Sequence, residues 1–208
     1  AMTITIGLLI FDRVEELDFV GPWEVFTMAQ ESGADLRVVT VAPNGGTVRC
    51  AKGLRVIADH GFADAPKLDV LLVPGGNGTR ALATNETVLG WIRDTARDCR
   101  WVTSVCTGAL LLAASGVAAG RTLATHWNFA DQLEARGEVT VARDRRYVQD
   151  GNMVSAAGVS AGIDMALWLT GQLFGDDLAR ATQKYMEYDP RPPYEIAGWL
   201  PPDRVAER

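Results

Sequence analysis

One cysteine in the sequence stands where a nucleophile is expected. Cys106 comes directly after the apolar, β-branched run 101–105 and directly before the leucine-rich run 107–115, with no loop between them. A strand that passes straight into a helix forces a sharp turn, and the residues two before and two after that turn must be small. Here those residues are Ser104 and Gly108. The S-x-C-x-G pattern therefore predicts a nucleophile elbow that presents sulfur.

The predicted elbow also favours thiolate chemistry. A helix that begins at Thr107 places the sulfur of Cys106 at its N-terminus, where free N–H groups and the helix dipole favour an anion. Thiolate is the nucleophilic form of cysteine, and a helix N-terminus lowers the thiol pKa. The alternative is a small buried cysteine, which the elbow pattern disfavours. Cys50 and Cys99 lack this context, and we interpret both as structural.

A glycine loop is expected beside the elbow. The buried run 68–73 ends in a proline followed by Gly75 and Gly76. Ligands of open parallel sheets bind beyond the carboxyl ends of the strands, so the loop and Cys106 should lie at one edge. The N–H groups of both glycines and of Thr107 could form an oxyanion hole. An ordinary glycine-rich turn explains the loop equally well, and a phosphate loop is disfavoured because no lysine follows.

Two further side chains are candidates for proton transfer or binding. Asp18 lies between apolar neighbours, where burial would raise its pKa and suit it to proton transfer near neutrality; the alternative is an acid that caps a helix N-terminus. His126 follows a short predicted strand, and either faces the pocket or is a structural imidazole. Two histidines and three separated cysteines give no metal-ligand spacing, so we expect no metal site.

A second elbow-like motif is interpreted as structural. The segment 158–162 reads G-x-S-x-G, but no histidine follows position 126. An α/β-hydrolase needs its histidine after the serine, so Ser160 has no downstream base. We interpret the segment as close packing of a strand on a helix, with Val159 as a candidate pocket-lining residue.

The elements that must position these residues alternate between apolar runs and helical stretches, which predicts a mostly parallel sheet covered by helices. Pro22 is expected as the first residue of a helix that runs to 31. Segments 139–141 and 147–149 are expected to pair as strands. The sequence predicts one α/β domain over 2–188, followed by an extended, proline-rich arm over 189–208. The expected strands are 3–10, 36–41, 68–73 and 101–105, with a hairpin over 47–57, and the expected helices include 86–98, 107–115, 127–136, 160–173 and 176–188.

Composition narrows the class of protein. The formal net charge of −6 over 208 residues disfavours binding to nucleic acid or to an anionic membrane. Three cysteines do not form a secreted disulfide framework, which favours a reducing, cytoplasmic location. The opening apolar run 4–11 lacks a basic flank and predicts a strand, not a signal peptide. No apolar run approaches the ~20 residues that span a bilayer.

Several of these motifs together resemble one known family. The motifs run in order along residues 3 to about 188 and resemble the ThiJ/PfpI superfamily, which is class I glutamine amidotransferase-like. Within it, the chain is most similar to isocyanide hydratases and to the sensor halves of AraC-type regulators. The motifs are 17–22 (LDFVGP), 74–76 (PGG), 103–108 (TSVCTG), 125–127 (THW) and 158–164 (GVSAGID).

The resemblance implies a flavodoxin-like three-layer sandwich, a homodimer and a nucleophilic Cys106 that is assisted by Asp18, with no cofactor or metal. The implied reaction adds water to an isocyanide and yields an N-substituted formamide through a thioimidate on Cys106. Residues around Thr107 and the 74–76 loop would position the thiolate and the adduct. The protease-like branch has a histidine where this chain has Thr107, so an adjacent Cys-His peptidase dyad is disfavoured, although His126 could replace that histidine in space.

Two alternatives to a hydratase stay open. The first is a ligand or redox sensor without turnover, related to AraC-type regulators. Those regulators carry a helix-turn-helix segment after the shared domain, whereas about twenty proline-rich residues follow Tyr188 here, so direct DNA binding is disfavoured. The second is a cysteine-dependent amidase, which would accumulate an acyl-enzyme on Cys106.

Overall fold

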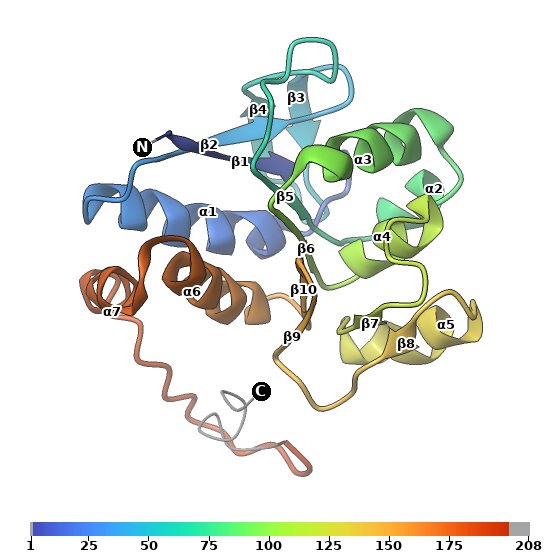
Figure 1. The fold of residues 1–208 in the computed structure, drawn as a ribbon. Coiled ribbons are helices and arrows are strands. Elements are labelled where there is room, and N and C mark those ends of the chain that lie inside the picture. Colours follow the sequence, from blue (N-terminus) through green and yellow to red (C-terminus); the bar gives the residue numbers. More distant parts are fainter. Residues whose placement is uncertain (1, 200–208) are drawn as a thin grey trace.

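A six-stranded, mostly parallel sheet forms the centre of the protein, whose computed structural model describes residues 2–199 (Figure 1). The strand order is β2-β1-β5-β6-β10-β9, and only β9 runs antiparallel to its neighbour. The strands are β1 (Ile4–Leu9), β2 (Leu36–Val41), β5 (Val70–Val73), β6 (Trp101–Val105), β9 (Tyr147–Asp150) and β10 (Met153–Ala156). All residues of β1 and β5 and four of the five residues of β6 are buried, most of those in β1 and β5 apolar, as expected for strands covered on both faces.

Helices cover both faces of this sheet and complete a flavodoxin-like three-layer sandwich. Figure 1 shows α1, α6 and α7 together on one face and α2, α3 and α4 on the other. The helices are α1 (Glu16–Glu31), α2 (Thr79–Leu82), α3 (Glu86–Asp98), α4 (Gly108–Ser115), α5 (Ala130–Ala135), α6 (Ala161–Phe174) and α7 (Asp176–Tyr185). Individual residues determine where two of these helices begin or end: the Asn85 side chain caps the N-terminus of α3, and Gly116 ends α4 in the left-handed conformation.

The first helix begins earlier than its proline suggests. α1 starts at Glu16, so the expected start at Pro22 is wrong. A proline inside a helix lacks the N–H that would bond the carbonyl four residues before it, here that of Asp18. Packing compensates, because Pro22 is buried and lies against the start of α6 at Gly162. The consequence is that Asp18 lies in the first turn of α1, not in a loop before it.

Two small sheets lie outside the central one. The expected hairpin over 47–57 is present as β3 (Gly46–Arg49) and β4 (Arg55–Ala58). The expected pairing of 139–141 with 147–149 is wrong: β8 (Thr140–Val141) pairs with β7 (Thr122–Leu123), and β9 pairs with β10. A tight turn at Gly151, with φ of 60°, joins β9 to β10. Because the turn brings these two strands together, β9 pairs with β10 and not with β8.

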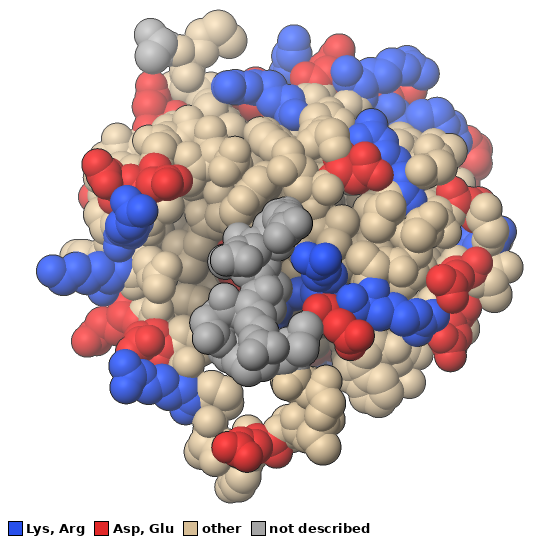
Figure 2. Space-filling view, turned by 60° about the horizontal axis from the view of Figure 1, so that its bottom comes forward, with Lys and Arg blue, Asp and Glu red and all other residues tan. Residues whose placement is uncertain are grey.

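The C-terminal part leaves the sandwich as an extended segment. Residues 189–199 form no helix or strand and are exposed, including the side chains of Tyr194, Ile196 and Trp199. The rest of the expected arm, 200–208, lies outside the described residues. Basic and acidic side chains alternate over the described part of the face in Figure 2, without a large patch of one sign. No helix within 2–199 is both long enough and apolar enough to cross a membrane.

Candidate functional site

Cys106 occupies a strained elbow between β6 and α4. Its φ is 58°, in the left-handed region that residues with a side chain rarely adopt. Surrounding bonds hold this conformation: the Cys106 N–H donates to the Ala157 carbonyl at 2.9 Å, and the Cys106 carbonyl accepts from the Thr125 hydroxyl at 2.8 Å. Strain that the surroundings hold in this way is common at functional sites. The elbow inferred from the sequence is therefore present.

The small residues around the elbow are required by space. A Cβ on Gly108 would lie 2.0 Å from the Val73 carbonyl oxygen, so α4 approaches the end of β5 at a distance that only glycine allows. Ser104, on the other side of the elbow, is fully buried. These contacts bring the start of α4 against the loop that follows β5, which carries Gly75 and Gly76.

Three segments distant in sequence meet at Gly75. Its N–H donates to Asp18 Oδ2 at 2.9 Å, and the next N–H, of Gly76, donates to Thr107 Oγ1 at 2.9 Å. A Cβ on Gly75 would lie 2.5 Å from Thr107 N and 3.0 Å from Asp18 Oδ2. The loop thus ties the first turn of α1 to the elbow, and brings Asp18 and Thr107 together.

These bonds correct the expected role of the two glycines. The N–H groups of Gly75 and Gly76 were expected to face an oxyanion, but both already donate to protein side chains. A donor engaged in this way is not free to bind a developing negative charge. The two glycines instead position the Asp18 carboxyl and the Thr107 hydroxyl.

Asp18 is a buried acid with an unusual pKa. Its side chain has no exposed surface, and burial raises its pKa from 3.8 to about 7, although the Gly75 N–H and the Cys106 thiol both act to lower it. Among the described atoms, Asp18 Oδ1 has no hydrogen-bond partner. This carboxyl therefore changes protonation near neutrality, and its Oδ1 is free to take up a proton.

The Cys106 thiol keeps its proton at neutral pH. Burial, and next the charge of Asp18, raise the pKa of Cys106 from 9.0 to about 12. Hydrogen bonds from the N–H groups of Thr107 and Val159 and from the Thr107 hydroxyl oppose this rise. The thiolate-stabilising effect expected of the helix N-terminus is therefore present but outweighed. The pair rests as a thiol beside a carboxyl that is partly ionised.

Val159 contributes its backbone to the site. It follows β10 and has φ of 43°, an outlier for a β-branched residue. In this conformation its N–H reaches the sulfur of Cys106. The sequence predicts that Val159 lines the pocket, and its N–H acts to lower the pKa of the Cys106 thiol. The neighbouring Ser160 is exposed and contacts Arg146 at 3.4 Å, which supports its interpretation as a structural residue.

His126 borders the site without bonding to its reactive groups. Its ring packs against Gly158, whose Cβ would lie 2.4 Å from His126 Cδ2. Nδ1 accepts the Asn128 N–H at 3.1 Å, so Nε2 carries the proton of the neutral ring. Burial, and next the positive charge of Arg80, lower the pKa of His126. The structure thus places a neutral imidazole at the rim.

Several residues near the elbow were not found from the sequence. Thr79 Oγ1 lies 3.4 Å from Thr107 Oγ1, and the neighbouring Arg80 donates to Thr79 Oγ1 at 3.1 Å. Thr125 holds the Cys106 carbonyl. The T-H-W motif pointed to the segment of Thr125, but no sequence pattern marks Thr79 or Arg80.

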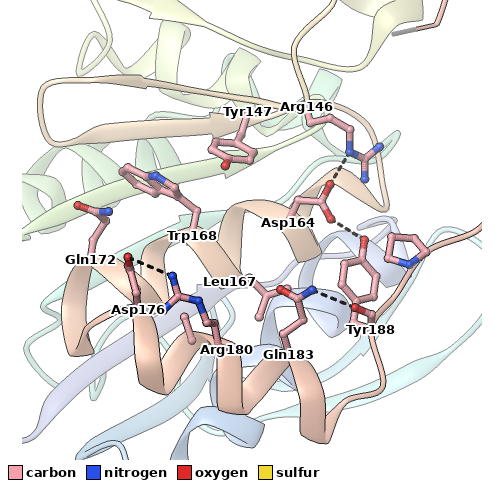
Figure 3. A pocket seen from close by; sticks show the side chains of 13 residues that line it. Arg146, Tyr147, Asp164, Leu167, Trp168, Gln172, Asp176, Arg180, Gln183 and Tyr188 are labelled. Carbon is pink, nitrogen blue, oxygen red and sulfur yellow. Dashed lines mark hydrogen bonds and ion pairs between the residues drawn. The ribbon is translucent and has the colours of Figure 1, made fainter. Parts of the chain in front are cut away.

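The elbow does not open into the cavity between α6, α7 and β9. Cys106 is only 6% exposed. A separate cavity of about 460 Å³ lies between α6, α7 and β9, lined in part by Tyr147, Trp168 and Arg180 (Figure 3). Its charged groups pair with one another, as Arg146 does with Asp164 at 2.6 Å. No cluster of three or more histidine, cysteine or acidic side chains within residues 2–199 could hold a metal ion.

Comparison with known proteins identifies the family. The model of the DJ-1/PfpI family matches residues 4–172. The chain is 41% identical to an isonitrile hydratase of Pseudomonas putida over 194 residues, which cover 93% of this chain and 82% of the relative. It is similar in structure to a ThiJ/PfpI family protein of Pseudomonas syringae, with a TM-score of 0.86 and 31% identity over 95% of this chain and 80% of the other.

A second kind of relative is a regulator. The chain is 29% identical to the HTH-type transcriptional regulator GbdR of Pseudomonas aeruginosa over 187 residues. This match covers 89% of this chain but only 51% of the regulator. The sandwich, the cysteine elbow and these matches define the class as a three-layer α/β protein with an elbow cysteine. The chain belongs to the DJ-1/PfpI family.

Proposed function

We propose that the protein hydrates isocyanides to N-substituted formamides, with Cys106 as nucleophile and Asp18 as the group that moves protons. The observation that carries this proposal is the geometry of the pair: Cys106 lies at a strained elbow with φ of 58°, and the Gly75 N–H holds the buried Asp18 carboxyl next to it with a 2.9 Å bond. Burial raises the pKa of this carboxyl to about 7. Such a carboxyl accepts a proton at neutral pH and gives it back, and both steps are needed when water adds across a carbon atom.

The first half of the reaction forms a thioimidate. Ionised Asp18 takes the thiol proton as the Cys106 sulfur bonds to the terminal carbon of R–N≡C. Asp18 then returns this proton to the same carbon, which leaves R–N=CH–S attached to the enzyme and Asp18 ionised again. The N–H groups of Thr107 and Val159 hold the sulfur while it carries negative charge.

The second half adds water. Asp18 takes a proton from water as the water oxygen bonds to the thioimidate carbon, and delivers that proton to the nitrogen. The hydroxyl proton of the resulting R–NH–CH(OH)–S passes to Asp18 as the carbon–sulfur bond breaks. The product R–NH–CHO leaves, and the sulfur recovers its proton from Asp18. Water is the only co-substrate, so the scheme needs no cofactor or metal.

Similarity to the isonitrile hydratase of Pseudomonas putida supports the proposal, because the match extends over 93% of this chain. The experiment is a formamide assay with cyclohexyl isocyanide on wild-type protein, Cys106→Ser and Cys99→Ser. Cys99 is a matched control: it is buried, and its thiol donates to the Leu68 carbonyl at 3.5 Å, a bond that serine can replace. We expect turnover by wild type and Cys99→Ser, and a loss of at least about 1000-fold with Cys106→Ser.

The second candidate function is a ligand or redox sensor. The match to GbdR favours it, although the chain spans about half of that regulator. A sensor would not turn over an isocyanide while Cys106 is reduced, and mild peroxide would convert Cys106 reversibly to sulfenic acid. Mass spectrometry of peroxide-treated protein, alongside the formamide assay, separates the two functions. A burst of acyl-enzyme with an amide or ester substrate would instead indicate an amidase.

The assembly and location that we propose follow from the family and from the cysteines. We infer a homodimer in the cytoplasm. All three cysteines are free and buried, as in a protein kept in a reducing compartment.

A further inference from the structure

A polar chain leads from the elbow to an arginine. Thr107, next to Cys106, has its Oγ1 at 3.4 Å from Thr79 Oγ1. Thr79 Oγ1 in turn accepts a hydrogen bond from Arg80 Nη1 at 3.1 Å. The Arg80 guanidinium therefore lies two polar contacts away from the residue that follows the nucleophile. Thr79 and Thr107 are buried, whereas Arg80 is exposed.

Arg80 is held in place without an acidic partner. Its guanidinium carbon lies 4.7 Å from the centre of the Phe129 ring, a cation–π contact with a buried aromatic side chain. Arg80 Nη1 also lies 3.4 Å from the Gly76 carbonyl oxygen. Within residues 2–199, no carboxylate comes within ion-pair distance of Arg80, whereas Arg143 and Arg146 both pair with acids.

His126 and Trp127 belong to the segment on which Arg80 packs through Phe129. His126 packs against Gly158, next to the Val159 N–H that reaches the sulfur, and the charge of Arg80 acts on its ring. Trp127 follows and is 74% exposed. The elbow is thus bordered by a fixed cation, a neutral imidazole and an exposed indole.

We propose that Arg80 selects isocyanides whose nitrogen substituent carries a carboxylate, an inference that rests on the proposed function. In this proposal, the terminal carbon bonds to Cys106 and the substituent on nitrogen extends away from the sulfur toward Arg80. The planar guanidinium fork matches a carboxylate in a bidentate arrangement. Its charge also offsets the repulsion between an anionic substrate and ionised Asp18, while the Trp127 indole covers the apolar part of the substituent.

The test compares isocyanoacetate with its methyl ester, which differ in charge but hardly in size. The measured quantity is kcat/KM for formamide production, expressed as the ratio of acid to ester. Wild-type protein should prefer the acid. Arg80→Gln should lower the ratio about 10- to 100-fold, the usual effect of losing one charge-assisted contact. Arg80→Lys should recover part of the ratio, because it restores the charge without the fork.

A matched control is Arg37→Gln. Arg37 is exposed on β2 and has no ion pair among the described residues, so its removal changes net charge equally and should leave the ratio unaltered. Raising the ionic strength should increase KM for the acid but not for the ester.

The outcomes separate the two proposals. If wild-type protein hydrates the ester but does not prefer the acid, or if Arg80→Gln lowers both rates equally, the selectivity proposal is overturned and the hydratase stands. If cyclohexyl isocyanide is hydrated but neither the acid nor the ester is, the selectivity proposal is likewise overturned and the hydratase stands. If none of the three compounds is hydrated while Cys106 is reduced, the proposed function fails, and the substrate inference fails with it.

Discussion

At the scale of single residues, the sulfur of the Cys106–Asp18 pair carries a proton at neutral pH. A cysteine with a lowered pKa would rest as thiolate, but burial and Asp18 keep the Cys106 thiol protonated at neutral pH. Nucleophilic attack therefore requires a base at the moment of reaction. Asp18 interacts with the Cys106 thiol, has one carboxylate oxygen without a partner and has a pKa near neutrality, so the two residues are expected to work as a unit.

Activity should follow the titration of Asp18. Below pH 7 the carboxyl is protonated and cannot accept the thiol proton, so kcat/KM should rise with pH and level off above about 7. Asp18→Asn should lose at least about 100-fold in kcat/KM, and its kcat/KM should not rise with pH in this range. A pH profile of formamide production between pH 5 and 9 measures both. If Asp18→Asn shows the same rise of kcat/KM with pH, a group other than Asp18 causes that rise.

The stability of the fold should depend on the same group. In the folded protein the pKa of Asp18 is raised from 3.8 to about 7, so its contribution to stability is present at low pH and is lost as pH rises through this range. The free energy of unfolding should fall by up to about 1.4 kcal/mol per pH unit between these values. Asp18→Asn removes this titration, so its Tm relative to wild type should be higher at pH 8 than at pH 4. Thermal melts at both values check this, and a constant difference would contradict it.

At the scale of elements, strand register brings the site together. Val73 of β5 pairs with Ser104 of β6, and Val105 pairs with Ala156 of β10, so the three strands end at the same edge. The segments that follow them supply the 74–76 loop, Cys106 and Val159. The first turn of α1 then adds Asp18 through its bond to the loop.

This close approach predicts the effect of one methyl group. Gly108→Ala would bring a Cβ to 2.0 Å from the Val73 carbonyl, so α4 must move away from β5. We expect a loss of about 1–3 kcal/mol in unfolding free energy and at least a tenfold loss in kcat/KM. Gly90→Ala in α3 is the control, because the nearest atoms lie 3.9 Å away and alanine should stabilise the helix by about 0.5–1 kcal/mol. Urea unfolding and the formamide assay measure both variants.

At the scale of the whole molecule, the helix that carries Asp18 has two large apolar side chains that the rest of the fold leaves partly uncovered. Leu17 and Trp23 of α1 are 37% and 42% exposed. Large apolar side chains left exposed are common at interaction surfaces. A second copy of the chain seated on this part of α1 would also shield the nearly buried Cys106 from water.

The proposed homodimer gives a direct expectation. Light scattering after size-exclusion chromatography should show twice the chain mass of 22.4 kDa. Trp23→Glu places a charge on the exposed side of α1 and should shift the population toward monomer, whereas Trp199→Glu on the extended segment serves as a control outside α1. A monomeric wild type, or a dimer that Trp23→Glu leaves intact, would argue against α1 as the interface.

The sequence by itself determined the elbow and the frame that carries it. The strand 101–105, the helix 86–98 and the small residues around Cys106 follow from neighbours in the chain, and the structure reproduces them. The start of α1 did not follow, because the local signal of Pro22 is overruled by its packing against α6. The β9–β10 pairing did not follow either, since strand pairing depends on partners outside each run.

Only the tertiary structure decided the chemistry around the sulfur. The bond from Gly75 to Asp18 joins residues 57 positions apart, and the bond from Gly76 to Thr107 joins residues 31 apart. No local pattern encodes which N–H groups these side chains accept, nor that Thr79 and Arg80 lie next to Thr107. The pKa of Cys106 is also a property of the fold, because burial and a distant carboxyl outweigh the helix N-terminus that the sequence places next to it.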